Sequence, residues 1–278
     1  MIIPWKVNFL LQQLTWSTYK KTNDVMLSPL TYYGSLVDLA RNKRITAPWT
    51  FNLKTGSTVN IKHFMSSYIF REIFIDECYD EALQSITTDF PYILEIGGNT
   101  GLFALRAKTL YPKARIHSFE PEAQNYSAFK SLIQKNELED VYVYKEAVGS
   151  ESGLINLHLN DKNVGGHSTV NTFAGNRIET VAMVSILDVL EEHLIFDLVK
   201  IDCEGAEYQI LMTLEPKHTG QVPKIIFETI NEGAKTRNLF AHLTSIGYTI
   251  RPSHNLFIAE VAGHSKRLEH IHVHSTAS

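Results

Sequence analysis

Cysteine is scarce in this sequence of 278 residues, in which Cys78 and Cys203 are the only two. They lie far apart in the chain and form no disulfide framework, so we expect a reducing compartment and a cytoplasmic location. Blocks rich in lysine and arginine are also absent, and the formal net charge is −4. This charge balance gives no electrostatic basis for a nucleic-acid partner.

Long hydrophobic runs are missing as well. No stretch approaches the ~18 apolar residues that a transmembrane span requires. Polar side chains interrupt the apolar N-terminal stretch "MIIPWKVNFLLQQLTW", and no small-residue cleavage site follows it. Its apolar residues recur at helical spacing, so we interpret it as an amphipathic helix rather than a signal peptide.

The hydrophobic content of 44% and the charged content of 20% are typical of a globular protein with a real core. From Pro91 onward, strand patterns alternate with helical ones. This alternation predicts an α/β fold, a doubly wound, Rossmann-like parallel sheet with helices on both faces. The clearest strands are "YILEI" (92–96), "RIHSFE" (115–120), "VYVYKEAV" (141–148), "FDLVKID" (196–202) and "KIIFET" (224–229).

The N-terminal part has a different, mixed pattern. Ser28 followed by Pro29 predicts a helix start, with the helix running to about Arg41. The stretch "WTFNLKTGSTVNIKHF" predicts a hairpin, because its apolar residues alternate on both sides of a turn. We therefore predict three parts: an N-terminal extension of helices and a hairpin (1–64), the α/β domain (65–263) and a C-terminal tail (264–278).

Acidic residues end most of the predicted strands. In sheets of this kind ligands bind beyond the carboxyl ends of the strands, near the point where the strand order reverses. The acids at these ends are Glu95, Glu120, Glu146, Asp202 and Glu228, and a glycine-rich turn, "GGNTG", follows the first of them. Their common location indicates a site for one ligand.

The glycine-rich turn does not have the pattern that binds a dinucleotide. A G-x-G-x-x-G motif that begins at Gly97 would need glycine where the chain has Asn99 and Leu102. A carboxylate at Glu95 repels a pyrophosphate but favours a ligand with an ammonium group and a positive sulfur, which indicates S-adenosyl-L-methionine. Glu120 can accept hydrogen bonds from both ribose hydroxyls of such a nucleoside. The alternative is that both acids only stabilise the following helix N-termini.

A second group of acids lies in "VKIDCEGAEYQIL" (199–211), at a strand end and the first turn of a helix. The structural alternative is that these acids stabilise the helix, with Asp202 as its N-cap. Methyl transfer to a hydroxyl needs alignment of the reactants and a base within hydrogen-bond reach. The candidate bases are Asp202, Glu204, Glu228 and a histidine, His167, in the glycine-containing stretch "NVGGHSTVN". Asp202 is also predicted to contact the cofactor, because the strand end that carries it borders the reactive end of the cofactor in this fold.

Cys203 lies between two acids and should not form a stable thiolate nucleophile. Asp202 and Glu204 could supply oxygen ligands to Mg²⁺, although nothing in the sequence demands a metal. The histidines of the tail "HIHVH" could bind a transition metal, but a solvated C-terminus is the simpler interpretation.

Five motifs, "ILEIGGNTG", "SFEPEAQNY", "YKEAVGS", "VGGHSTV" and "VKIDCEGAEYQIL", follow one another in this order. In this they resemble the FkbM-type methyltransferases, over roughly residues 65–260. The resemblance implies a class I S-adenosylmethionine-dependent fold, with seven strands of which the last is antiparallel. It also implies roles for single residues. Glu120 would bind the ribose of the cofactor, and backbone near Glu146 and Ala147 would contact its adenine. The methionine tail would lie against the turn residues Gly97, Gly98, Asn99 and Gly101.

These observations predict an S-adenosyl-L-methionine-dependent methyltransferase that acts on a hydroxyl oxygen, and the resemblance implies that the acceptor is a small molecule, a polyketide, a sugar or a glycan. The loop 160–177 is predicted to close over the acceptor, because loops of this length inside a compact domain are usually functional. Two rival functions are a non-catalytic scaffold that binds the cofactor and a nicotinamide-dependent reductase. The sequence leaves the oligomeric state open.

Overall fold

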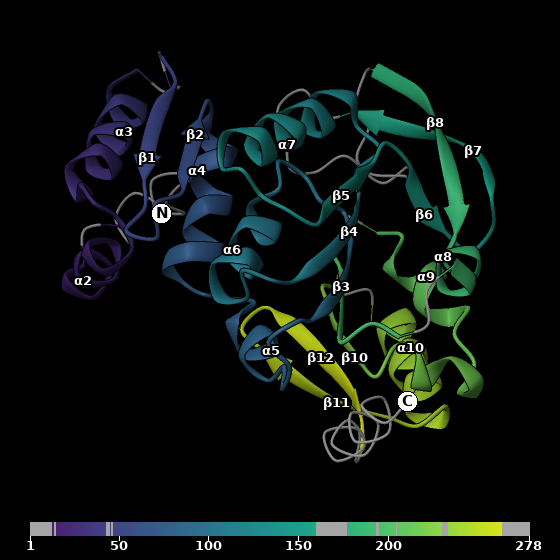
Figure 1. Ribbon diagram of the computed structural model, residues 1–278. Coiled ribbons are helices and arrows are strands. Elements are labelled where there is room, and N and C mark those ends of the chain that lie inside the picture. The colour runs from purple at the N-terminus through teal and green to yellow at the C-terminus, as the bar shows by residue number, and fades with distance from the viewer. Residues whose placement is uncertain are drawn as a thin grey trace, which may run out of the picture. The chain divides into compact units, whose positions relative to one another are not determined.

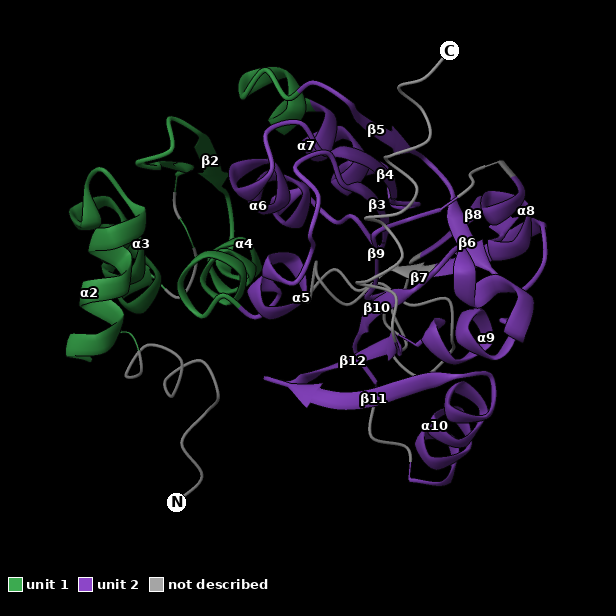
Figure 2. Cartoon of the chain, turned by 60° about the horizontal axis from the view of Figure 1, so that its bottom comes forward, with its two compact units in different colours: residues 1–77, 131–138 green, residues 78–130, 139–278 purple. Residues whose placement is uncertain are grey.

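The computed structural model describes residues 13, 15–42, 45, 47–159, 177–192, 195–203, 205–229 and 233–262. The predicted N-terminal helix, most of the loop 160–177 and the C-terminal histidines lie outside these ranges. The chain divides into two compact units, coloured separately in Figure 2: unit 1 (residues 1–77 and 131–138) and unit 2 (78–130 and 139–278). The boundary predicted between residues 64 and 65 falls inside unit 1.

Unit 1 consists of helices and one hairpin. Its elements are α2 (Trp16–Val25), α3 (Pro29–Asn42), β1 (Trp49–Asn52), β2 (Thr58–Ile61), α4 (Phe64–Phe70) and the π-helical turn η1 (Arg71–Ile75). The predicted helix at Pro29 and the antiparallel hairpin are confirmed. Helix α2 was not predicted, because its sequence is mostly polar. It begins where the Thr15 hydroxyl accepts a hydrogen bond from the N–H of Thr18 (3.1 Å).

Aromatic rings form the centre of unit 1. Phe51 lies 5.7 Å from Tyr32 and 4.9 Å from Phe70 between ring centroids. Residues 131–138 join this unit through Asn136, whose side chain accepts from the N–H of Thr58 (2.6 Å) and donates to its carbonyl (3.0 Å). A residue far along the chain thus completes the edge of the N-terminal hairpin.

Unit 2 is built on a seven-stranded sheet in the order β11-β12-β10-β9-β3-β4-β5 (Figure 1). Its strands are β3 (Tyr92–Ile96), β4 (Arg115–Phe119), β5 (Val141–Tyr144), β9 (Leu198–Ile201), β10 (Lys224–Phe227), β11 (Tyr248–Ser253) and β12 (Leu256–Val261). Strand β12 runs opposite to the other strands of this sheet, pairing antiparallel with both β10 and β11. The predicted doubly wound, Rossmann-like sheet of seven strands, whose last strand is antiparallel, is confirmed.

Helices cover both faces of this sheet, as Figures 1 and 2 show, with α6 and the start of α7 on one side and α9 and α10 on the other. The helical elements of unit 2 are α5 (Asp80–Gln84), α6 (Leu102–Leu110), α7 (Ala123–Lys135, ending in unit 1), α8 (Ile186–Glu192), α9 (Glu207–Met212), η2 (Pro216–Gly220) and α10 (Ala234–Ser245). In the described ranges no helix is long and apolar enough to cross a membrane.

A second sheet of three strands has the order β6-β8-β7. It contains β6 (Ala147–Gly149), β7 (Gly153–Leu159) and β8 (Arg177–Ser185). The prediction of one continuous strand over 141–148 is therefore wrong. The first part pairs with β4 in the main sheet, whereas Ala147 pairs with Met183 in the small one.

The alternation of side chains along the central strand β3 decides which of its residues face the apolar core and which face the opposite side of the sheet. Leu94 and Ile96 of β3 face the apolar core that α9 and α10 cover. Glu95, between them, therefore faces the other way. Its register partners on the neighbouring strands are Ser118 of β4 and Lys200 of β9, so a carboxylate and an ammonium lie side by side within the sheet layer.

Candidate active site

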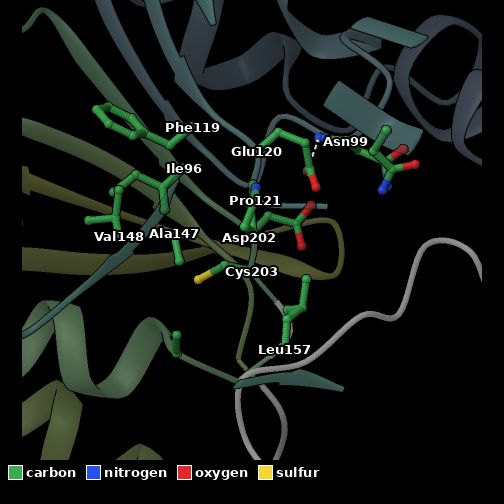
Figure 3. Close-up of a pocket in the computed structure, with 13 residues that line it drawn as sticks. Ile96, Asn99, Phe119, Glu120, Pro121, Ala147, Val148, Leu157, Asp202 and Cys203 are labelled. Carbon is green, nitrogen blue, oxygen red and sulfur yellow. Dashed lines mark hydrogen bonds between the residues drawn. The ribbon is translucent and has the colours of Figure 1, made fainter. Parts of the chain in front are cut away.

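A pocket lies at the carboxyl ends of β3, β4 and β9, where the strand order reverses, as predicted (Figure 3). The ends of these strands and the small sheet both contribute to its wall. The lining residues are Ile96, Gly97, Asn99, Phe119, Glu120, Pro121, Asn125, Ala147, Val148, Leu157, Asp202, Cys203 and Ala206. Lysine, arginine and histidine are absent from this set of lining residues.

The glycine-rich turn after β3 is shaped by close packing. Gly97 has φ +82°, and a Cβ at this position would lie 1.9 Å from the carbonyl oxygen of Asp202. A Cβ at Gly101 (φ +87°) or at Gly98 would lie within 3 Å of the ring of Phe129 on α7. Two of the predicted turn residues, Gly97 and Asn99, line the pocket, whereas Gly98 and Gly101 serve the packing of the turn on α7.

Glu120 is anchored by two backbone groups. Its Oε2 accepts from the N–H of Asn99 (2.7 Å) and its Oε1 from the N–H of Glu122 (2.9 Å). The side chain is 6% exposed, and burial raises the pKa of its carboxyl group to about 7 against the opposing effect of these two N–H groups. Figure 3 shows the carboxyl group pointing into the pocket.

Glu95 does not line the pocket. It is 1% exposed, and neither carboxyl oxygen has a hydrogen-bond partner in the described part of the chain. Burial raises the pKa of this carboxyl group to about 7, while the Lys200 ammonium opposes that shift. Because Glu95 lies on the opposite face of β3 from Ile96, it can influence the pocket through its charge but does not border it.

Asp202 follows β9 and lies in the pocket wall, where its carboxyl group turns toward the same space as that of Glu120 (Figure 3). Its Oδ2 accepts a hydrogen bond from the hydroxyl of Tyr79 (2.8 Å) and lies 3.4 Å from Nζ of Lys200. The same Nζ donates to the carbonyl of Gly97 (2.6 Å). Lys200 thus links the ends of β3 and β9.

Lys200 itself is 4% exposed. Burial lowers the pKa of its ammonium group, but the carboxylates of Asp202 and Glu95 outweigh burial and raise that pKa overall. The ammonium group therefore stays charged inside the protein. A buried cation of this kind requires the nearby carboxylates, because an unpaired charge in this position would be strongly destabilising.

Glu207 holds the turn that follows Asp202. Its two carboxyl oxygens accept from the N–H groups of Cys203 (2.8 Å) and Gly205 (2.7 Å). The residue that precedes α9 is Ala206, without a side-chain cap, so the alternative in which Asp202 caps this helix is wrong. Burial, with Glu207 and Asp202 nearby, raises the pKa of the Cys203 thiol, which favours the protonated thiol over the thiolate.

Some predicted site residues remain without a structural account. His167 and Glu204 lie outside the described residues. Glu146 is absent from the pocket wall, although its neighbour Ala147 lines it. The prediction missed Tyr79 and Lys200. A lysine inside the apolar strand "LVKI" was a usable signal, whereas Tyr79, 123 positions before Asp202, gave none.

The sheet order and the pocket at its reversal define a Rossmann-like class I methyltransferase fold. The family model described as "Methyltransferase FkbM domain" matches residues 95–249, and the chain belongs to this family. This finding confirms the family predicted from the five motifs, and it makes the protein a member of a methyltransferase family.

Similar proteins are also named as methyltransferases. The chain is 27% identical over 223 residues to methyltransferase sdnD of Sordaria araneosa, covering 68% of this chain and 85% of that protein. It is 24% identical over 239 residues to the 31-O-demethyl-FK506 methyltransferase FkbM of Streptomyces tacrolimicus, covering 72% and 89%. The solved structure of methyltransferase FkbM from Methylobacillus flagellatus KT is 14% identical, with a TM-score of 0.48, covering 70% of this chain and 53% of that one.

Proposed function

We propose that this protein transfers the methyl group of S-adenosyl-L-methionine to a hydroxyl oxygen of a small molecule. The observation that carries the proposal is the pair of carboxyl groups, Glu120 and Asp202, that face one pocket at the reversal point of the sheet. A pocket with two acids and no basic side chain among its described lining residues suits a ligand with an ammonium and a sulfonium group. The same wall would repel the pyrophosphate of a nicotinamide dinucleotide.

The chain's own residues fit the parts of this cofactor. Each oxygen of Glu120 uses one acceptor site on a backbone N–H and keeps another for a ribose hydroxyl. Apolar groups of Phe119, Ala147 and Val148 would pack on the adenine. Gly97 and Asn99 would line the methionine tail. Glu95 would add negative charge from behind the wall rather than contact the cofactor.

Bound S-adenosyl-L-methionine would supply an electrophilic methyl group. An acceptor hydroxyl that takes this methyl group would have to give up its proton to a base, and S-adenosyl-L-homocysteine would be the other product. Asp202 would border the reactive end of the cofactor and would also hold the acceptor hydroxyl or take its proton, because its carboxyl group lies in the pocket wall. His167 and Glu204 remain candidate bases from the sequence. The described ranges contain no cluster of three metal-binding side chains.

The name of one relative supports the class of acceptor. The Streptomyces protein is named for 31-O-demethyl-FK506, so its substrate is defined by a missing O-methyl group. We therefore propose that this chain also methylates a small molecule that carries a free hydroxyl. Carbohydrates remain within that class, since they offer the same nucleophile.

A label-transfer screen tests this proposal. Hydroxylated small molecules, sugars and glycans would be incubated with the protein and methyl-labelled S-adenosyl-L-methionine, with the Asp202→Asn variant as the matched control. We expect label on the oxygen of at least one acceptor with the wild-type protein, and far less with the variant. Tight cofactor binding without transfer to any acceptor class would favour a non-catalytic scaffold instead.

A further inference from the structure

Tyr79 contacts the proposed site from outside the segment that matches the family. The match begins at residue 95, whereas Tyr79 directly precedes α5. Its side chain is 6% exposed, and its hydroxyl donates to Oδ2 of Asp202 (2.8 Å). A buried tyrosine hydroxyl that donates to a carboxylate makes one of the stronger classes of hydrogen bond.

The surroundings of Tyr79 fix the ring in place. Its ring meets that of Phe103 on α6 edge to face, with 5.1 Å between centroids. Nζ of Lys200 lies 5.8 Å from the centroid of the Tyr79 ring and 6.0 Å from that of Phe103. The hydroxyl therefore approaches Asp202 from a rigid, aromatic wall, on the same oxygen that Lys200 faces.

This arrangement divides the two oxygens of Asp202 between two tasks. Oδ2 is occupied by Tyr79 and lies near Lys200. Both acceptor sites of Oδ2 therefore face protein groups, and among the described residues these contacts of the carboxyl group involve Oδ2, so Oδ1 is the oxygen available to a ligand in the pocket. A carboxylate that is held at one oxygen loses little further freedom when the other binds a ligand, which favours binding and alignment.

We propose that Tyr79 is a positioning residue, which holds Oδ2 of Asp202 so that Oδ1 faces the cofactor and the methyl acceptor. The inference rests on the proposed function, because it assigns Asp202 to that site. It adds a residue that the family-matching segment does not contain. Tyr79 acts through Asp202 and is not expected to touch the reacting atoms.

The decisive variant is Tyr79→Phe, which removes the hydroxyl and keeps the ring against Phe103. Tyr111→Phe is the matched control, since the Tyr111 hydroxyl also donates to a protein oxygen, the carbonyl of Leu83 (2.9 Å), but in a different place. Calorimetry with S-adenosyl-L-methionine is the readout. We expect Tyr79→Phe to weaken binding about 5-fold or more, the size of a typical lost hydrogen bond, and Tyr111→Phe to leave it unchanged.

A double-mutant cycle separates positioning from a general structural role. Added to Asp202→Asn, the Tyr79→Phe change should weaken binding by less than about 2-fold, because its effect passes through the carboxylate that is already gone. Equal effects of Tyr79→Phe in both backgrounds would overturn the inference, as would wild-type binding by the single variant. No cofactor binding by the wild-type protein would instead refute the proposed function.

Discussion

The backbone N–H of Asn99 donates a 2.7 Å hydrogen bond to Oε2 of Glu120. The turn after β3 and the acid that ends β4 are thereby fixed to one another. The carboxyl group of Glu120 takes a second N–H, from Glu122, and points into the pocket. Its orientation is set before any ligand binds, which lowers the ordering cost of binding a ribose.

Removal of the buried charge at Glu95 should change how stability depends on pH. The pKa of this carboxyl group is about 7 in the folded protein, against an ordinary value of about 4.3. The folded state therefore holds the proton more tightly, and the contribution of Glu95 to stability falls as pH rises from about 4.3 to 7. The change in melting temperature that Glu95→Gln causes should therefore be more favourable at pH 8 than at pH 5.

Thermal unfolding at both pH values measures this effect. Glu139→Gln is the matched control, since Glu139 is exposed on the same unit and should change neither melting temperature by much. Glu120 has a raised pKa as well, so a residual pH slope should persist in Glu95→Gln. An equal change in melting temperature at both pH values would contradict the raised pKa of Glu95, and a larger loss of stability at pH 8 than at pH 5 would show that its charged form is needed.

Alanine at Gly101 should strain the turn. The position has φ +87°, and a Cβ would lie 2.3 Å from Cδ2 of Phe129. Strain and overpacking of this kind cost about 1–3 kcal/mol each. Denaturant unfolding of Gly101→Ala should show this loss, together with weaker cofactor binding. Gly220→Ala, which has open space around the new Cβ, should show neither change; equal stability of the two variants would refute the packing role.

The order of the helices and strands, and the strand ends at which the site lies, could be predicted from the sequence. Regular alternation of strands and helices is a local signal, and so are the helix start at Pro29 and the hairpin turn after Asn52. The face of Glu95 could not be predicted in this way. A strand that is buried on both faces shows no alternation of apolar and polar residues, so the sequence does not reveal which way its one acid points.

Contacts between segments that lie far apart in the chain could not be predicted from the sequence either. The small sheet requires β6 to leave the main sheet and pair with β8, more than thirty positions later. The hydrogen bond from Tyr79 to Asp202 joins residues 123 positions apart. Both depend on how the layers pack, and neither leaves a periodic pattern in either segment.

Asp202→Asn should lower turnover strongly. The change keeps the shape of the side chain and removes the charge, so an acceptor hydroxyl would lose its base or its orienting group. In a folded variant we expect turnover to fall ~10²-fold or more, measured by methyl-label transfer to an acceptor from the screen. Unchanged turnover would remove Asp202 from the reaction and direct the search for a base to His167, with His167→Ala as the next variant.

Calorimetry with S-adenosyl-L-homocysteine and NAD, on the wild-type protein and Glu120→Ala, tests the central claim most directly. We predict that the wild-type protein binds S-adenosyl-L-homocysteine and not NAD. Loss of the ribose contacts of Glu120 should cost ~2–3 kcal/mol, so the variant should bind tens-fold more weakly, with Glu139→Ala as the unaffected control. Tight binding of NAD without binding of S-adenosyl-L-homocysteine would contradict the account.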